Sequence, residues 1–193
     1  MRKVLFLMMA LGMTLASCTN KAPEKEQPIE EPAAAAPDSD LVAAAEDNIK
    51  AHQEDIDAFW KLTFGEDKKI ANYYLANNDV FLSTEDGKDG VLVTFYKDAR
   101  DANNFDCVPV RDGQELSFQG DALVIRDNDK ITYFAKTESE GYNELFSEAE
   151  KDGKKSYTND KGEPYDEKEA QAFLDKIGKE KASPLSDILV KWK

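Results

Sequence analysis

The chain has 193 residues, of which 41% are hydrophobic, 33% charged and 10% aromatic. This length and composition predict one folded domain with an apolar core, and they exclude a chain that is disordered throughout. The net charge of -14 makes nucleic acid and anionic lipid headgroups unfavourable partners, because the field of the protein repels phosphates. Cations, basic proteins and neutral ligands such as glycans stay open, and the acidic excess also serves solubility.

The N-terminus begins with Arg2 and Lys3, followed by an apolar segment over residues 4–11. This segment has the length of the apolar region of a signal peptide and is shorter than the roughly 20 residues that span a bilayer. The sequence Leu15-Ala16-Ser17-Cys18 follows, and it resembles the lipobox of bacterial lipoproteins. The resemblance implies that residues 1–17 are removed and that Cys18 carries acyl chains, which anchor the protein to a membrane. The alternative is an ordinary secretory signal with a cysteine there by chance.

Residues 18–39 are predicted to form an acylated cysteine and a disordered tether. They hold four prolines and four glutamates, and almost no large apolar residue apart from Ile29. Such a segment buries too little surface to offset its ordering entropy. The acids after the cysteine also resemble the export tag of some Gram-negative surface lipoproteins, although Lys21 and Lys25 dilute them. The predicted location is the cell envelope, as an outer-membrane lipoprotein that faces either the cell surface or the interior.

Residues 40–193 are predicted to form a single domain. Apolar side chains recur at steps of three and four after the N-cap candidates at 38–40, which predicts one long helix over residues 40–62. A shorter helix is predicted within residues 66–78. Alternating apolar segments bounded by turn residues then predict six short strands, over residues 79–84, 90–97, 105–110, 115–119, 122–126 and 130–136.

Helical spacing returns in the last third of the chain. Residues 142–149 carry apolar side chains on one predicted helix face, and residues 153–165 indicate a hairpin or loop. A helix over about 166–180 is predicted with Asp166 as its cap, and Ser183-Pro184 begins a last short helix. The predicted fold class is therefore α+β, with a single antiparallel meander sheet of about six strands, a long N-terminal helix and C-terminal helices.

Two of the predicted strands, at residues 91–95 and 122–125, are apolar on both faces. We therefore expect the sheet to be covered by a helix on one side and curled on itself on the other. This outline resembles cystatin-like and NTF2-like domains, which often bind peptides or small molecules. No motif in the chain is specific enough to carry the role of any residue across.

Candidate catalytic and metal-binding residues are few. His52 is the only histidine and lies on the apolar stripe of the first helix, which excludes most multi-histidine zinc sites and favours a place in the core or at its rim. Cys107 is expected to be buried in a strand. Residues 148–159 begin like an EF-hand loop, but Asn159 stands where calcium binding needs a bidentate glutamate. No catalytic residue, metal site or cofactor is assigned.

Aromatic rings are the remaining candidates for ligand binding. Neighbouring residues of a strand point to opposite faces, so the ring of Tyr96 or Tyr133 could lie on the surface and stack on a sugar or peptide. Packing in the core is the alternative for both rings.

We interpret the chain as a lipid-anchored, non-enzymatic binding or interaction module whose partner is an envelope protein or a glycan. One alternative is an envelope hydrolase with paired carboxylates, which requires two carboxyl groups about 5 to 9.5 Å apart in a pocket. Another alternative is an acidic inhibitor of a cationic protein such as lysozyme, whose capture should weaken as salt rises.

Overall fold

The structure is a computed structural model that describes residues 36–76, 79–96, 105–137 and 141–192. All of these residues fall in one compact unit, Ala34–Lys193. The predicted signal peptide, Cys18 and most of the predicted tether lie outside the described residues. Within the described part of the chain, no helix is long and apolar enough to cross a membrane.

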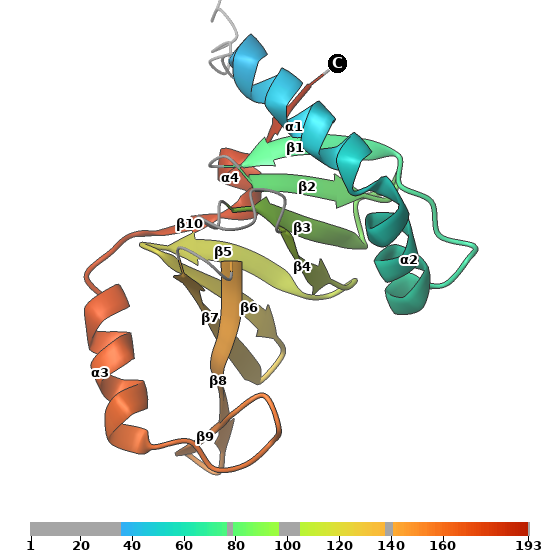
Figure 1. Cartoon of the computed structure of the whole chain (residues 1–193). Helices are drawn as coiled ribbons and strands as arrows, with labels where there is room; N and C mark the ends of the chain where they lie inside the picture. Colours follow the sequence, from blue (N-terminus) through green and yellow to red (C-terminus); the bar gives the residue numbers. More distant parts are fainter. Residues whose placement is uncertain (1–35, 77–78, 97–104, 138–140, 193) are drawn as a thin grey trace, which may run out of the picture. The chain divides into compact units, whose positions relative to one another are not determined.

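The fold combines helices with two antiparallel sheets, which corrects the expected single sheet (Figure 1). The five-stranded sheet has the order β11 (Val190–Lys191), β1 (Asn72–Ala76), β2 (Asp79–Ser83), β3 (Gly90–Phe95) and β4 (Phe105–Val110). The six-stranded sheet has the order β10 (Ala182–Pro184), β5 (Glu115–Gln119), β6 (Ala122–Asp127), β7 (Lys130–Thr137), β8 (Gly141–Lys151) and β9 (Lys154–Thr158). Both sheets are therefore meanders, each extended at one edge by a short C-terminal strand.

β1 and β8 occupy segments for which the sequence predicted helices. In β8 the physical reason is a bulge: the register shifts opposite Tyr133, so that Leu145 is an extra residue between two paired ones. A bulge reverses the alternation of faces, and as a result Tyr142 lies between the two sheets while Phe146 lies on the outer side. Apolar residues on such a strand fall three and four apart, which imitates the period of a helix.

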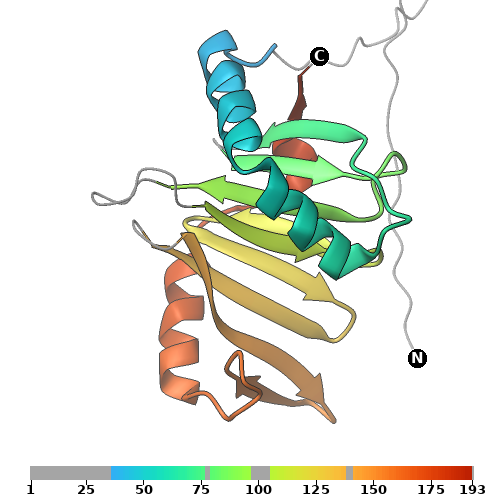
Figure 2. The same ribbon diagram turned by 45° about the vertical axis from the view of Figure 1, so that its right-hand side comes forward.

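The segment expected to be one helix over residues 40–62 forms α1 (Ser39–Ala51) and α2 (Gln53–Phe64). Asp38 caps α1, because its side chain accepts a hydrogen bond from the N–H of Asp40 at 2.8 Å. The two helices meet at His52, whose φ of -113° and ψ of 15° interrupt the helical geometry. This break gives α1 and α2 different directions across the same sheet (Figure 2).

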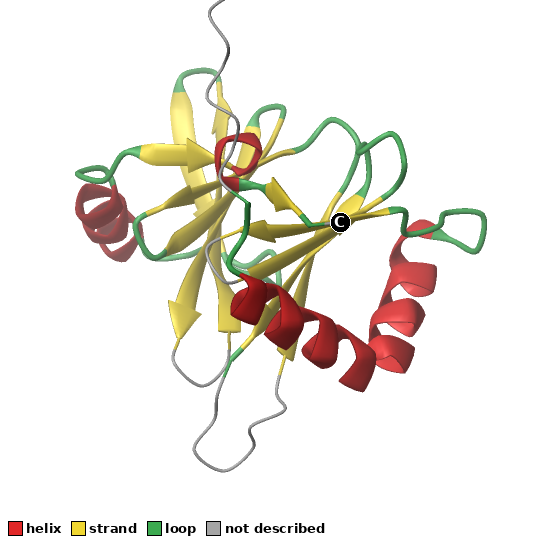
Figure 3. Ribbon diagram, turned by 90° about the horizontal axis from the view of Figure 1, so that it is seen from above, coloured by secondary structure: helices red, strands yellow, loops and turns green. Residues whose placement is uncertain are grey.

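Apolar residues form one core between the sheets and a further core under each helical layer. In β3, Leu92 points between the sheets, whereas Val91 and Val93 point toward α1 and α2. In β6, Leu123 points between the sheets, and Val124 points toward α3 (Glu167–Ile177). Figure 3 shows α1 and α2 on one side of the strands and α3 on the other. The two-faced apolar strands thus have a helical cover as expected, and their second cover is another sheet.

The C-terminal segment, residues 182–192, joins the two sheets. β10 pairs with β5 of the six-stranded sheet, and β11 pairs with β1 of the five-stranded sheet. Between them, α4 (Leu185–Ile188) places Leu185 in the core between the sheets. The last helix is therefore a single turn between two short strands. α3, by contrast, begins at the predicted cap Asp166, whose carboxylate accepts hydrogen bonds from two backbone N–H groups.

Candidate functional site

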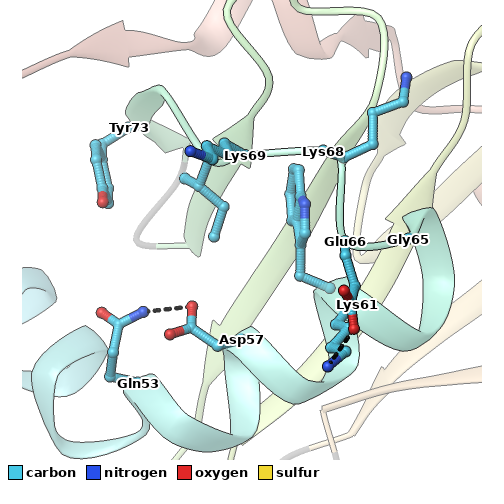
Figure 4. Close-up of a pocket in the computed structure, with 10 residues that line it drawn as sticks. Gln53, Asp57, Lys61, Gly65, Glu66, Lys68, Lys69 and Tyr73 are labelled. Atoms are coloured by element: carbon cyan, nitrogen blue, oxygen red, sulfur yellow. Dashed lines mark hydrogen bonds and ion pairs between the residues drawn. The ribbon is translucent and has the colours of Figure 1, made fainter.

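A surface pocket lies between α2 and the loop that leads to β1 (Figure 4). α2 ends at Gly65, whose φ of +90° favours glycine. The chain then turns back, so that Lys69, Ile70 and Tyr73 face Gln53, Asp57 and Trp60 of the helix across the opening. The volume of this cavity, about 490 Å³, is in the range of small-molecule sites. We call it the α2 pocket.

Most of the charged groups in the α2 pocket already have partners. Gln53 Nε2 donates to Asp57 Oδ1 at 2.7 Å, and Lys61 pairs with Glu66 at 2.6 Å, as Figure 4 shows. Lys68 pairs with Asp89. Among the residues that the structure describes, Lys69 makes no ion pair, and no hydrogen bond reaches the second carboxylate oxygen of Asp57. The pocket is therefore nearly balanced in charge, with a few polar atoms left to bind a ligand.

Trp60 supplies an additional unpaired group. Its side chain is only 4% exposed and packs on Phe64, with 4.9 Å between ring centroids. Its indole Nε1 is buried and has no hydrogen-bond acceptor within the described part of the chain. A buried donor without an acceptor destabilises a protein by about 1–3 kcal/mol. An oxygen atom from a ligand would remove that cost.

Tyr73 gives the α2 pocket an accessible aromatic ring. It is 37% exposed, and the ring of Trp192 lies beside it, 5.9 Å away between centroids. Because β11 carries the chain to Trp192, its pairing with β1 holds both rings at this edge of the sheet.

A second polar site lies between the sheets, away from the α2 pocket. Phe81 in β2, Leu92 in β3 and Val108 in β4 point between the sheets. Two positions away on the same strands, and therefore on the same face, lie Asp79, Thr94 and Asp106. We call these three residues the polar row. Asp79 is 2% exposed, and its carboxylate accepts a hydrogen bond from the Tyr142 hydroxyl at 3.1 Å and pairs with Lys136 at 3.4 Å. Asp106 accepts hydrogen bonds from the backbone N–H groups of Cys107 and Tyr142.

Burial changes the proton affinity of the polar row. It raises the pKa of Asp79 above its ordinary value, although the ammonium of Lys136 and the hydroxyl of Tyr142 act in the opposite direction. Burial also raises the pKa of Asp106. The two residues lie two strands apart, which places their Cα atoms about 10 Å from each other. Neither side chain lines the α2 pocket.

The two tyrosines proposed as ligand-binding residues lie in different environments. Tyr133 is 8% exposed and packs on Phe146 at 5.0 Å and on Phe173 of α3 at 6.3 Å. Its ring is part of the core under α3. Tyr96 is half-buried, and its ring approaches Gly141 so closely that a Cβ there would lie 2.9 Å from Tyr96 Cε1. Neither residue lines the α2 pocket.

His52 and Cys107 occupy neighbouring places under α2. The half-buried ring of His52 packs on Phe105, with 4.3 Å between centroids, as expected for a histidine at the rim of the core. Cys107 lies in strand β4, as predicted, but it is only half-buried. Desolvation, together with the carboxylates of Asp106 and Asp55, raises the pKa of its thiol to about 12. The thiol is therefore neutral at pH 7 and unsuited to nucleophilic attack.

The segment that begins like an EF-hand forms the hairpin of β8 and β9. Its turn residues Asp152 and Gly153 have φ values of 55° and 73°, which suit a two-residue turn. Glu148 pairs with Lys155 at 2.7 Å. Within the described residues, no group of three or more histidine, cysteine, aspartate or glutamate side chains is placed to hold a metal ion.

Sequence reasoning missed both polar sites. Trp60 is one of the apolar residues in the segment predicted as the first helix, and nothing in that spacing indicates a pocket at the end of the helix. The polar row did have a signal: Asp79 and Asp106 each precede an inward-pointing apolar residue by two positions, and the alternation of a strand places both carboxylates inside.

The chain has no match among models of known protein families, curated proteins or solved structures. Its class is therefore described by the fold alone: two antiparallel sheets between helical layers, with a polar pocket beside α2.

Proposed function

We propose that this chain is a lipid-anchored protein of the bacterial envelope, facing outward from the outer membrane, whose folded domain binds a partner without catalysis. The α2 pocket is the binding site. The observation that carries this proposal is the buried indole N–H of Trp60, which has no hydrogen-bond partner among the described residues and belongs to a residue that lines a pocket of small-molecule size. The lipobox-like sequence that ends at Cys18 supports the anchor, and the proline-rich segment after it supports a tether.

Mass spectrometry of protein from its native host tests the anchor. The expected mature protein begins at Cys18 and carries the mass of two or three acyl chains. The variant Cys18→Ser should lose this mass and leave the membrane fraction. A bare thiol at position 18 in the native protein would contradict the anchor, and protease shaving of intact cells separates surface display from an inward orientation.

Co-sedimentation with isolated cell-wall polymer from the host tests the binding function. The full chain, kept soluble in detergent, should co-sediment with the polymer and release no soluble sugar or peptide. The double variant Asp57→Asn, Lys69→Ala should reduce the bound fraction at least about fivefold, because it removes two groups of the α2 pocket that remain open to a ligand.

The matched control is Asp175→Asn. Asp175 accepts a hydrogen bond from Gln171 Nε2 at 2.8 Å on α3, in the same spacing as the Gln53 and Asp57 pair on α2. This control should bind the polymer like the unchanged protein. Equal binding by all variants would exclude the α2 pocket as the site, whereas release of fragments would indicate the hydrolase alternative.

A further inference from the structure

We propose that the ligand of the α2 pocket is a neutral sugar that carries an N-acetyl group, and this rests on the proposed function of the pocket as a binding site. Hydrogen bonding in the pocket favours an acetamido group. Among the described residues, Trp60 Nε1 is a donor without an acceptor, and one oxygen of Asp57 is an acceptor without a donor. A secondary amide presents a carbonyl oxygen and an N–H together, whereas a carboxylate only accepts and an ammonium only donates.

The charges of the pocket favour a neutral ligand. Lys61 pairs with Glu66, and Lys68 pairs with Asp89, and the pocket also holds both an open cation, Lys69, and the carboxylate of Asp57, so neither sign of ligand charge is favoured. The net charge of -14 also repels anions at long range. A neutral ligand avoids both costs, and the remaining polar groups of Gln53 and Lys69 suit sugar hydroxyls.

The sheet edge beside the pocket favours a sugar over a peptide. Extended peptides commonly bind by adding a strand to an open sheet edge. The outer edge of β1 beside the pocket already pairs with β11 at Tyr74 and Leu75. What the pocket offers is the exposed ring of Tyr73, whose flat face suits the apolar face of a pyranose ring.

Trp60 Nε1 is shielded from solvent, so the acetamido group reaches it only when a covering side chain moves. Lys68 and Lys69 line the same pocket, and both are exposed residues with long flexible stems. The hydrogen bond that the carbonyl oxygen then accepts from the indole is the physical signature of binding.

The indole N–H signals of the chain provide the test. Trp60 and Trp192 are the only tryptophans, so a ¹⁵N-labelled protein gives two indole cross-peaks in NMR, and Trp192→Phe assigns the peak of Trp60. The probes are N,N′-diacetylchitobiose, cellobiose, which has the same ring system without acetamido groups, and an N-acetylated alanine dipeptide. Diacetylchitobiose should shift the Trp60 indole signal saturably. Asp57→Asn should weaken this binding about tenfold, and the control Asp175→Asn should not change it.

The other outcomes separate this proposal from the previous one. An equal response to cellobiose would show that hydroxyl groups suffice and would overturn the acetamido assignment. A response to the dipeptide alone would overturn the sugar. If no probe shifts the Trp60 indole signal while polymer binding still depends on Asp57 and Lys69, the α2 pocket remains the binding site and the N-acetylated sugar is excluded as its ligand. If polymer binding is also independent of these residues, both proposals fail.

Discussion

At the scale of single residues, the polar row is the least expected feature of the core. Asp79 is buried beside the core between the sheets, and its carboxylate pairs with Lys136 and accepts a hydrogen bond from the Tyr142 hydroxyl. Removing a carboxylate from water is unfavourable unless its hydrogen bonds and charge are fully compensated. The raised pKa of Asp79 indicates that compensation at this site is incomplete.

This incomplete compensation predicts a specific pH dependence. Because the pKa of Asp79 is higher in the folded chain than its ordinary value of 3.8, the folded state binds a proton more readily than the unfolded state. The contribution of Asp79 to the free energy of unfolding should therefore increase as pH falls from the folded pKa toward 3.8, and it should be smallest above the folded pKa. In Asp79→Asn this contribution is absent.

Urea denaturation of both proteins between pH 7 and pH 4 measures the effect. The stability of the unchanged protein should rise relative to that of Asp79→Asn as the pH falls, by about 1.4 kcal/mol for each unit of pKa difference. The exposed turn residue Asp129 provides the control, since Asp129→Asn should leave the pH profile as it is. Parallel profiles for the unchanged protein and Asp79→Asn would refute the prediction.

At the scale of elements, the C-terminal segment is the part whose loss should matter most. Leu185 is buried between the sheets, whereas its neighbour Ser186 is exposed. Leu185→Ala should lower the free energy of unfolding by about 2–5 kcal/mol, because it leaves a cavity in the core that both sheets share. Ser186→Ala should change it by less than about 0.5 kcal/mol.

Truncation after Lys181 tests the role of the whole C-terminal segment. It removes β10, α4 and β11 together, and the truncated chain should lose the single cooperative unfolding transition. Denaturation followed both by tryptophan fluorescence and by circular dichroism detects this loss as two transitions that no longer coincide. A truncated chain that unfolds in one transition at the original midpoint would show that the segment is not needed to hold the sheets together.

The strands and helices also differ in how well the sequence predicts them. Segments with a clean alternation and a turn dipeptide, such as residues 79–83 and 90–95, form strands close to their predicted bounds. α3 likewise begins after its cap, Asp166. The helix predicted over residues 142–149, where β8 lies, was wrong because a one-residue bulge gives the strand the apolar spacing of a helix. The division into two sheets was not predictable, since it depends on contacts between residues far apart in sequence, such as Ser183 with Phe118 and Leu75 with Val190.

At the scale of the whole molecule, the acidic excess is the dominant property. A net charge of -14 over the 193 residues creates mutual repulsion in the folded state, which salt screens. Raising NaCl from about 10 mM to about 150 mM shortens the screening length from roughly 30 Å to 8 Å, and the melting temperature should rise by a few degrees. Differential scanning calorimetry measures this shift. A melting temperature that falls with salt would instead show that ion pairs such as Lys68 with Asp89 outweigh the repulsion.

The C-terminal segment, residues 182–192, has a consequence for the folding of the newly synthesised chain. β10 pairs with β5 of the six-stranded sheet, and β11 pairs with β1 of the five-stranded sheet. β11 ends at Lys191, close to the end of the chain's last described residues. While the ribosome is still adding these residues, β1 and β5 lack their pairing partners β11 and β10. The strand pairings that connect this segment to both sheets are therefore completed only after Lys191 has been released.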